Sequence, residues 1–91
     1  GETPLHLAIR GGNEEIFKML IEYGANINAQ NNKGETPLHL AIGNSNSSVF
    51  IETLIKEGAD VNAQNKKGST PLDLSIIYSY PHKAQILLKS G

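Results

Sequence analysis

Apolar residues occur in short clusters along this chain, and residues that start or end a helix bound each cluster. The first cluster lies within residues 5–9 and follows Thr3 and Pro4, a pair in which Thr caps a helix and Pro favours its first position. The second lies within residues 16–21 and follows Asn13, another good N-cap. Glycines follow both clusters, as expected after a helix. The pattern therefore predicts two short helices, one starting at Pro4 and one starting after Asn13.

A polar segment rich in turn formers follows at residues 25–34, and the pattern then begins again. The string at residues 1–9 recurs without change at residues 34–42, and an altered copy occupies residues 68–76. The copies are 33 residues (34 − 1) and 34 residues (68 − 34) apart. A fixed period of this length indicates one structural unit that is copied and stacked.

Each unit is predicted to be a helix, a turn, a second helix and an extended turn segment. Helices this short do not persist alone in water, so neighbouring units must stack and bury their apolar faces in one continuous core. We therefore expect an all-α repeat, or α-solenoid. It should form a single domain over residues 1–91, with repeats at about 1–33, 34–67 and 68–91, the last of them truncated.

The second and third copies differ from the first. The middle copy has one additional residue, which falls in the polar segment 43–48 and is expected to lie in a surface connection or, alternatively, in a binding loop. The third copy carries Asp73 in place of the repeated His, and Lys83 stands where the other copies have an apolar residue. Pro81 can open its second helix. We expect this third unit to fray first.

Three strings in this chain resemble the ankyrin repeat. They are Thr-Pro-Leu-His-Leu-Ala at residues 3–8, Gly-Ala-Asn-Ile-Asn-Ala at 24–29 and Gly-Ala-Asp-Val-Asn-Ala at 58–63, and the resemblance covers the whole chain. It implies L-shaped units, in which an antiparallel helix pair carries a projecting β-hairpin-like finger. It also implies a concave face, formed by fingers and first helices, that grips a protein partner. The resemblance implies no catalytic activity and no cofactor.

Composition narrows the choice of partner. The chain has 8 Lys and Arg against 9 Asp and Glu, a net charge of −1, and lacks the basic excess of a nucleic-acid binder. Its apolar runs are too short to cross a membrane, and its first residues lack the charged and apolar pattern of a signal peptide, so none is expected. The absence of Cys fits a reducing compartment. We therefore expect an intracellular protein that binds neither nucleic acid nor membrane.

His6 and His39 are candidates for metal binding or acid–base chemistry. The ankyrin resemblance instead implies that this His bonds near the helix start and ties adjacent units together. Stacked helices lie about 8–10 Å apart, whereas zinc needs nitrogen ligands at about 2.0–2.1 Å. A structural role is therefore expected for both. Asp73 can replace the cap through a Thr-x-x-Asp box with Thr70, and His82 is expected on the surface.

Asn28 and Asn62 recur at the base of the predicted fingers. One interpretation is that their side chains hydrogen-bond the finger backbone. The family resemblance implies another, in which such an Asn is the substrate of a factor-inhibiting asparaginyl hydroxylase that favours Leu eight positions before it and an acidic residue two before it. Asn62 has both in Leu54 and Asp60, whereas Asn28 lacks the acidic residue.

Exposed positions outside the repeated framework are the expected contacts with a partner. The resemblance places three groups of them along the concave face: the residue after the motif glycine, the finger tips and the end of the first helix. Tyr78 is prominent because Tyr is enriched at binding hot spots, although Tyr78 and Ile77 could instead pack against a further unit. The candidates are Glu2, Arg10, Asn32, Lys33, Glu35, Asn44, Lys66, Lys67, Ser69, Ile77 and Tyr78.

The outer faces of the end units leave further alternatives open. Terminal units of such arrays need polar outer faces, yet the first unit has the apolar pattern of an internal one. This favours an internal fragment of a longer array, or end-to-end self-association of uncapped repeats. The leading expectation is a protein-interaction module with a protein partner of unknown identity. The alternative is a structural spacer, or a designed or reconstructed scaffold, with no partner of its own.

Overall fold

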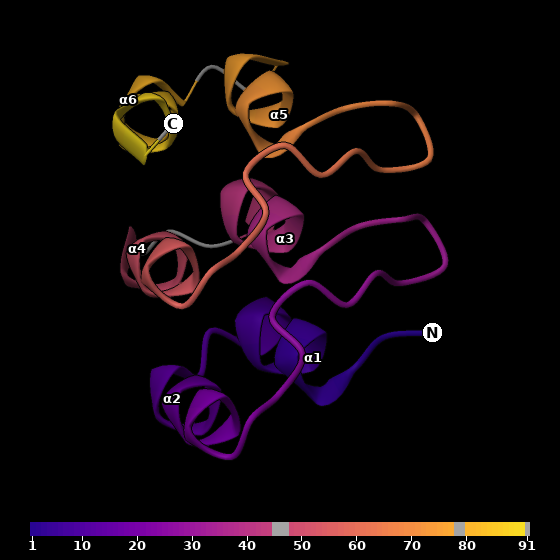
Figure 1. Ribbon diagram of the computed structural model, residues 1–91, viewed down its shortest axis with the longest axis vertical. Helices are drawn as coiled ribbons and strands as arrows, with labels where there is room; N and C mark the ends of the chain where they lie inside the picture. Colours follow the sequence, from indigo (N-terminus) through magenta and orange to yellow (C-terminus); the bar gives the residue numbers. More distant parts are fainter. Residues whose placement is uncertain (45–47, 78–79, 91) are drawn as a thin grey trace.

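The computed structural model describes residues 1–44, 48–77 and 80–90, and within these ranges it contains six α-helices and no strand. The helices form three consecutive pairs that stack along the long axis of the molecule (Figure 1). This arrangement confirms the predicted all-α repeat. The pairs are α1 (Pro4–Gly11) with α2 (Glu14–Glu22), α3 (Pro37–Asn44) with α4 (Ser48–Lys56), and α5 (Pro71–Ile77) with α6 (Pro81–Ser90).

Helices α1 and α2 begin where the capping residues predict. The side chain of Thr3 accepts a hydrogen bond from the backbone N–H of His6, and the His6 ring accepts one from the backbone N–H of Thr3, which completes a capping box. Asn13 caps α2 in the same way through its side-chain oxygen. Gly12 ends α1 with a φ of 69°, a left-handed conformation that residues with a Cβ rarely adopt.

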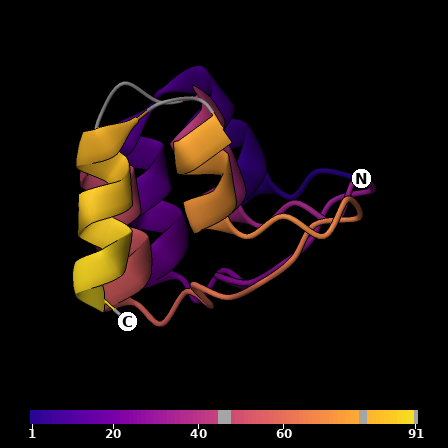
Figure 2. The same ribbon diagram turned by 90° about the horizontal axis from the view of Figure 1, so that it is seen from above.

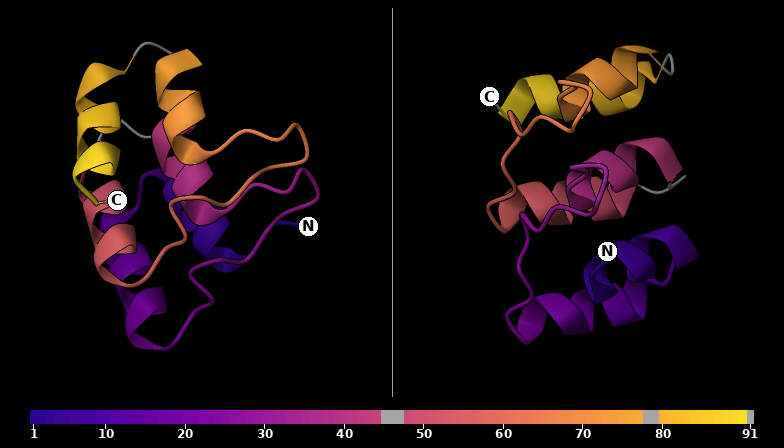
Figure 3. Two further views of the ribbon diagram at one scale, coloured as in Figure 1. Left: turned by 45° about the horizontal axis from the view of Figure 1, so that its top comes forward. Right: turned by 90° about the vertical axis from the view of Figure 1, so that its right-hand side faces the viewer.

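First and second helices form separate columns. Helix α3 packs between α1 and α5, and α4 packs between α2 and α6. Figure 3 shows the resulting layers from two sides, each layer being one antiparallel helix pair. The additional residue of the middle unit falls in the connection between its helices, because residues 12–13 separate α1 from α2 whereas residues 45–47 separate α3 from α4. Residues 45–47 themselves lie outside the described ranges.

The segment between α2 and α3 turns back on itself as a finger. The backbone N–H of Asn31 donates to the carbonyl of Glu35 at 3.0 Å, and that of Gly34 donates to the carbonyl of Asn31 at 2.9 Å. Neighbouring fingers are joined by a hydrogen bond of 3.0 Å from Lys66 N to Lys33 O. Gly34 has a φ of 75°, and a Cβ there would lie 2.8 Å from Lys66 N, so the close approach of the fingers requires glycine. The fingers are therefore hairpin-like, as the resemblance implies.

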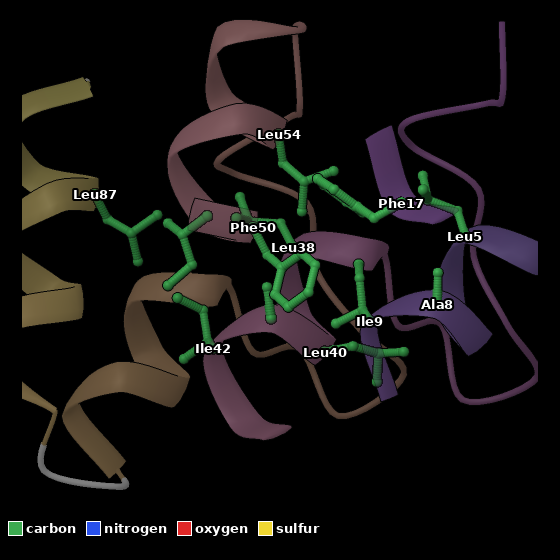
Figure 4. Packing of buried hydrophobic residues seen from close by; sticks show 12 residues of the cluster. Leu5, Ala8, Ile9, Phe17, Leu38, Leu40, Ile42, Phe50, Leu54 and Leu87 are labelled. Carbon is green, nitrogen blue, oxygen red and sulfur yellow. The ribbon is translucent and has the colours of Figure 1, made fainter. Parts of the chain in front are cut away.

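One continuous hydrophobic core runs through the three helix pairs (Figure 4). At its centre the rings of Phe17 and Phe50 meet edge to face, with centroids 4.7 Å apart, a geometry that adds about 0.5–1.5 kcal/mol beyond the buried area. Among the described residues, the third unit contributes only Leu87 to the fully buried apolar set. The buried set is Leu5, Ala8, Ile9, Phe17, Leu38, Leu40, Ala41, Ile42, Phe50, Ile51, Leu54 and Leu87.

Lys83 joins the third unit to the second. Its ammonium group donates a hydrogen bond of 2.8 Å to the carbonyl of Ile42, one of the last carbonyls of α3, which have no partner inside the helix. The same ammonium group lies 4.2 Å from the ring centroid of Tyr80. Burial lowers the pKa of Lys83, because desolvation penalises the charged form. The third unit thus has a charged side chain where the other copies have an apolar one, and this side chain caps the end of α3.

Candidate functional site

A groove with a volume of about 640 Å³ lies between the fingers and the first helices. The fingers extend together to one side of the helices, so each unit has the outline of an L (Figure 2). The groove lies in the inner angle of this L, where α1, α3 and α5 meet the fingers. It brings together most of the candidates predicted from sequence: Arg10, Asn32, Lys33, Glu35, Lys66, Lys67, Ser69 and Ile77.

The remaining candidates have other positions. Glu2 is not part of the groove lining, although it bonds to Arg10, which is. Helix α3 includes Asn44, whose side chain lies outside the described part of the structure, as does the whole of Tyr78. Leu40 and Leu74 are among the lining residues that were not predicted from sequence. Both belong to the repeated Leu positions, and nothing in the repeat indicates that this side of a core helix also lines a groove.

A charged network crosses from the first unit to the second. The Nε atom of Arg10 donates to both carboxylate oxygens of Glu2, at 2.7 and 2.8 Å, and a terminal nitrogen of Arg10 lies 3.8 Å from Glu35. Asn31 donates to Glu2 at 3.2 Å and to Glu35 at 3.0 Å. Burial alone would raise the pKa of Glu2, but hydrogen bonds from Arg10 and Asn31 outweigh it and the pKa is lowered. Arg10 thus neutralises these carboxylates only in part, since its single charge faces two of them.

The lysines at the finger tips have no such neutralising partner. Within the described ranges, Lys33, Lys66 and Lys67 take part in no ion pair, and all three are exposed. Their backbone is held in place: the side-chain oxygen of Asn31 accepts hydrogen bonds from the N–H groups of Lys33 and Glu35, and the equivalent Asn65 holds the second finger in the same way. The groove therefore has a rigid basic edge.

The repeated histidines link successive units. Nδ1 of His39 accepts the backbone N–H of Thr36 at 3.1 Å, so the ring proton is assigned to Nε2, which donates to the carbonyl of Ser69 at 2.9 Å. His6 makes the equivalent bond of 2.8 Å to the carbonyl of Glu35. Both rings are buried, and both nitrogens of each have protein partners. The histidines are therefore ties between units, as the resemblance implies.

Asp73 replaces the repeated His in the helix cap of the third unit. The backbone N–H of Thr70 donates to the Asp73 carboxylate at 2.9 Å, and the N–H of Asp73 donates to the Thr70 hydroxyl at 3.2 Å. This is the predicted capping box. The shorter, exposed Asp side chain ends at this cap, whereas His39 also reaches the next unit.

Asn28 and Asn62 hold equivalent positions but have different surroundings. The side-chain oxygen of Asn28 accepts the backbone N–H of Asp60 at 2.7 Å, and its nitrogen donates to the carbonyl of Gly58 at 3.4 Å, so it joins two units. The exposed carboxamide of Asn62 makes no hydrogen bond to any residue that the structure describes. Both side chains are exposed, so the two candidate hydroxylation positions differ in hydrogen bonding and not in burial.

Comparison with known proteins identifies the class. The family model of ankyrin repeats in three copies matches residues 5–91, so the chain belongs to the ankyrin-repeat family. A stretch of 34 residues is 56% identical to Rabankyrin-5 of Mus musculus and equally to Rabankyrin-5 of Homo sapiens. The matched stretch covers 37% of this chain and 3% of each relative, so the chain spans a small part of the length of these relatives.

No helix among the described residues combines the length and apolar character needed to cross a membrane.

Proposed function

We propose that this chain is a protein-interaction module whose groove between fingers and first helices binds a partner protein. Ankyrin repeats are generally protein-interaction modules. The kinds of side chain that line the groove support it as the binding surface. Residues 1–91 would act as one domain of three repeats, with boundaries at about 33–34 and 67–68, so that all three units contribute to one surface.

Repeated and non-repeated residues have different tasks in this proposal. The repeated Thr and His side chains are engaged in caps and ties between units. The groove is lined in part by repeated residues such as Leu40, and it adds side chains that differ between units, such as Arg10 at the end of α1 and Ile77 at the end of α5. A surface that varies on a constant framework is suited to recognition, because its side chains can change without loss of the fold.

A matched pair of substitutions tests the proposal. Ser69→Tyr places a bulky neutral side chain in the groove, whereas Gln85→Tyr makes the equivalent change on exposed α6. Immobilised wild-type chain and both variants are incubated with a cell extract, and captured proteins are quantified by mass spectrometry. Proteins retained by wild type and Gln85→Tyr but lost with Ser69→Tyr are expected. Equal retention by all three would refute binding through the groove, whereas specific retention by none of them would favour the spacer alternative.

A further inference from the structure

We propose that the groove accepts an extended acidic segment of the partner, followed by an apolar side chain that lies against Ile77. This inference rests on the proposed function and adds the chemistry of the bound segment. The acidic part would follow the basic edge formed by Lys33, Lys66 and Lys67. The apolar part would lie at the end of the groove formed by α5.

The charge distribution carries the first half of the proposal. Of the 8 basic residues in a chain with net charge −1, Lys33, Lys66 and Lys67 gather at adjacent finger tips that a backbone hydrogen bond joins. Carboxylates at this end of the molecule could neutralise them, but Glu2 and Glu35 are held by Arg10 and Asn31. The basic edge is thus available to an anionic group of the partner. Complementary charge across an interface raises the association rate and disfavours partners of like charge.

The apolar end carries the second half. Ile77 is 64% exposed and lines the groove beside Leu74, which is half-buried. Leu40, which is buried, also lines this groove. An apolar side chain of the partner that covers Ile77 would remove its own surface and that of Ile77 from water. The favourable free energy of this contact scales with the apolar area buried. Basic edge and apolar end occur in one groove, so one extended segment can meet both.

This combination favours a peptide over a nucleic acid. A phosphate backbone would use the three lysines but would leave Ile77 without an apolar partner. Nucleic-acid-binding domains are also usually basic as a whole, whereas this chain has more acidic than basic residues. An acidic peptide with an apolar residue matches the whole groove.

Selection from a library of short random peptides displayed on phage tests the inference with the whole 91-residue chain as bait. Enriched peptides should contain clustered Asp and Glu followed by Leu, Ile or Phe. Their dissociation constants are then measured by fluorescence anisotropy. Raising the salt from about 0.05 to about 0.5 M should weaken binding severalfold, because exposed charges are screened. Failure to enrich any peptide, or enrichment without acidic bias, would overturn the inference.

Two variants and a control assign the effect to the groove. Reversing two charges with Lys66→Glu and Lys67→Glu together should weaken binding of the selected peptide at least about tenfold. Ile77→Ser should weaken it about threefold or more, because it removes the apolar contact. The control Lys18→Glu with Lys56→Glu makes the same charge change on α2 and α4 and should alter affinity less than about twofold. An equal loss in the control would contradict the proposal, since net charge alone would then explain binding.

Different results would refute the groove as the binding surface and the acidic specificity of the bound segment. Peptides that lack acidic residues but still lose binding with Ser69→Tyr would leave the groove as the binding surface and refute only the acidic specificity. A mixed-sequence single-stranded oligonucleotide that binds more tightly than the acidic peptide, with the same dependence on Lys66 and Lys67, would also overturn the inference. Peptides that bind Ser69→Tyr as tightly as wild type would refute both levels.

Discussion

Nε2 of His39 donates a hydrogen bond of 2.9 Å to the backbone carbonyl of Ser69, so a buried ring at the start of one helix holds the finger of the next unit. The other ring nitrogen accepts the N–H of Thr36 in the helix cap. One side chain thus stabilises a helix start and an interface between units. The stack depends on this double role, because neither unit would bury enough apolar surface alone.

Substitutions at His39 should separate these two tasks. His39→Asn retains an acceptor that can reach Thr36 N but is too short for the carbonyl of Ser69, and it should lower the free energy of unfolding by about 1–2 kcal/mol. His39→Ala loses the cap as well and leaves a cavity, so a loss of about 3–4 kcal/mol is expected. Urea denaturation measures both values. Asp73→Asn, which alters only a local cap, is the control; a His39→Asn variant as stable as wild type would contradict the assignment.

Asn28 and Asn62 should differ in their effect on stability, although their sequence contexts are alike. Asn28→Ala removes the acceptor for Asp60 N and the donor for Gly58 O, which should cost about 0.5–1.5 kcal/mol. Asn62→Ala, at an exposed side chain, should stay within about 0.5 kcal/mol of wild type. Thermal unfolding of the two variants side by side makes the comparison. A larger loss at Asn62 would show that the two positions are not distinguished by the tie between units.

Hydroxylation should follow the same difference in hydrogen bonding of the two carboxamides. We propose Asn62, with Leu54 and Asp60 before it, as the substrate position for an asparaginyl hydroxylase. Co-expression with such an enzyme, followed by peptide mass spectrometry, should find an added oxygen on Asn62 and less or none on Asn28, whose carboxamide is engaged. Unmodified Asn62 under conditions in which a known substrate is modified would end the idea.

The third unit should open before the second. Among the described residues of α5 and α6, Leu87 is the one fully buried hydrophobic side chain, and Ile76, Ile77 and Leu88 are about two-thirds exposed. Local opening requires least free energy where few apolar contacts are broken. Amide hydrogen exchange should therefore be faster in α5 and α6 than in α3 and α4. Uniform protection of all four helices would contradict this expectation.

Lowering the pH should weaken the ion pair between Arg10 and Glu2. The pKa of Glu2 is lower in the folded chain than its usual 4.5, so the carboxylate contributes stability above that value and loses it as the pH falls through the lower, folded pKa. Carboxyl-detected NMR should report this lowered pKa in wild type and a return towards the usual value in Arg10→Met. An unchanged pKa in the variant would mean that Arg10 does not hold Glu2. The effect on stability should be small, because the pair is exposed.

Local signals in the sequence predicted the helices well because capping is a short-range property. Thr3, Asn13 and Pro81 each identify a helix start from adjacent residues alone, and the structure begins its helices there. The contacts that shape the groove are different. Asn31 bridges Glu2 and Glu35 across a unit boundary, which depends on how far adjacent fingers lie apart. Repeat spacing predicts neighbours along the stack but not which side chains bond across it.

Lys83 illustrates the same limit. Its sequence position, equivalent to Ile16 and Phe50, indicated only that a charged residue replaces an apolar one. Its ammonium group instead reaches Ile42, 41 positions away, and occupies a carbonyl at the end of α3. A side chain of that length can bring charge to any nearby acceptor, so its partner follows from the packing of α6 on α4 and not from local pattern.

The most direct test of the binding groove is an NMR map of the complex. Isotope-labelled chain is titrated with a protein captured by the wild type, and amide shifts are followed residue by residue. The account predicts that the largest changes cluster at residues 32–35, 65–69 and 77, with little change along the exposed sides of α2 and α4. Changes centred on α2, α4 and α6 instead, with the finger tips unaffected, would contradict it.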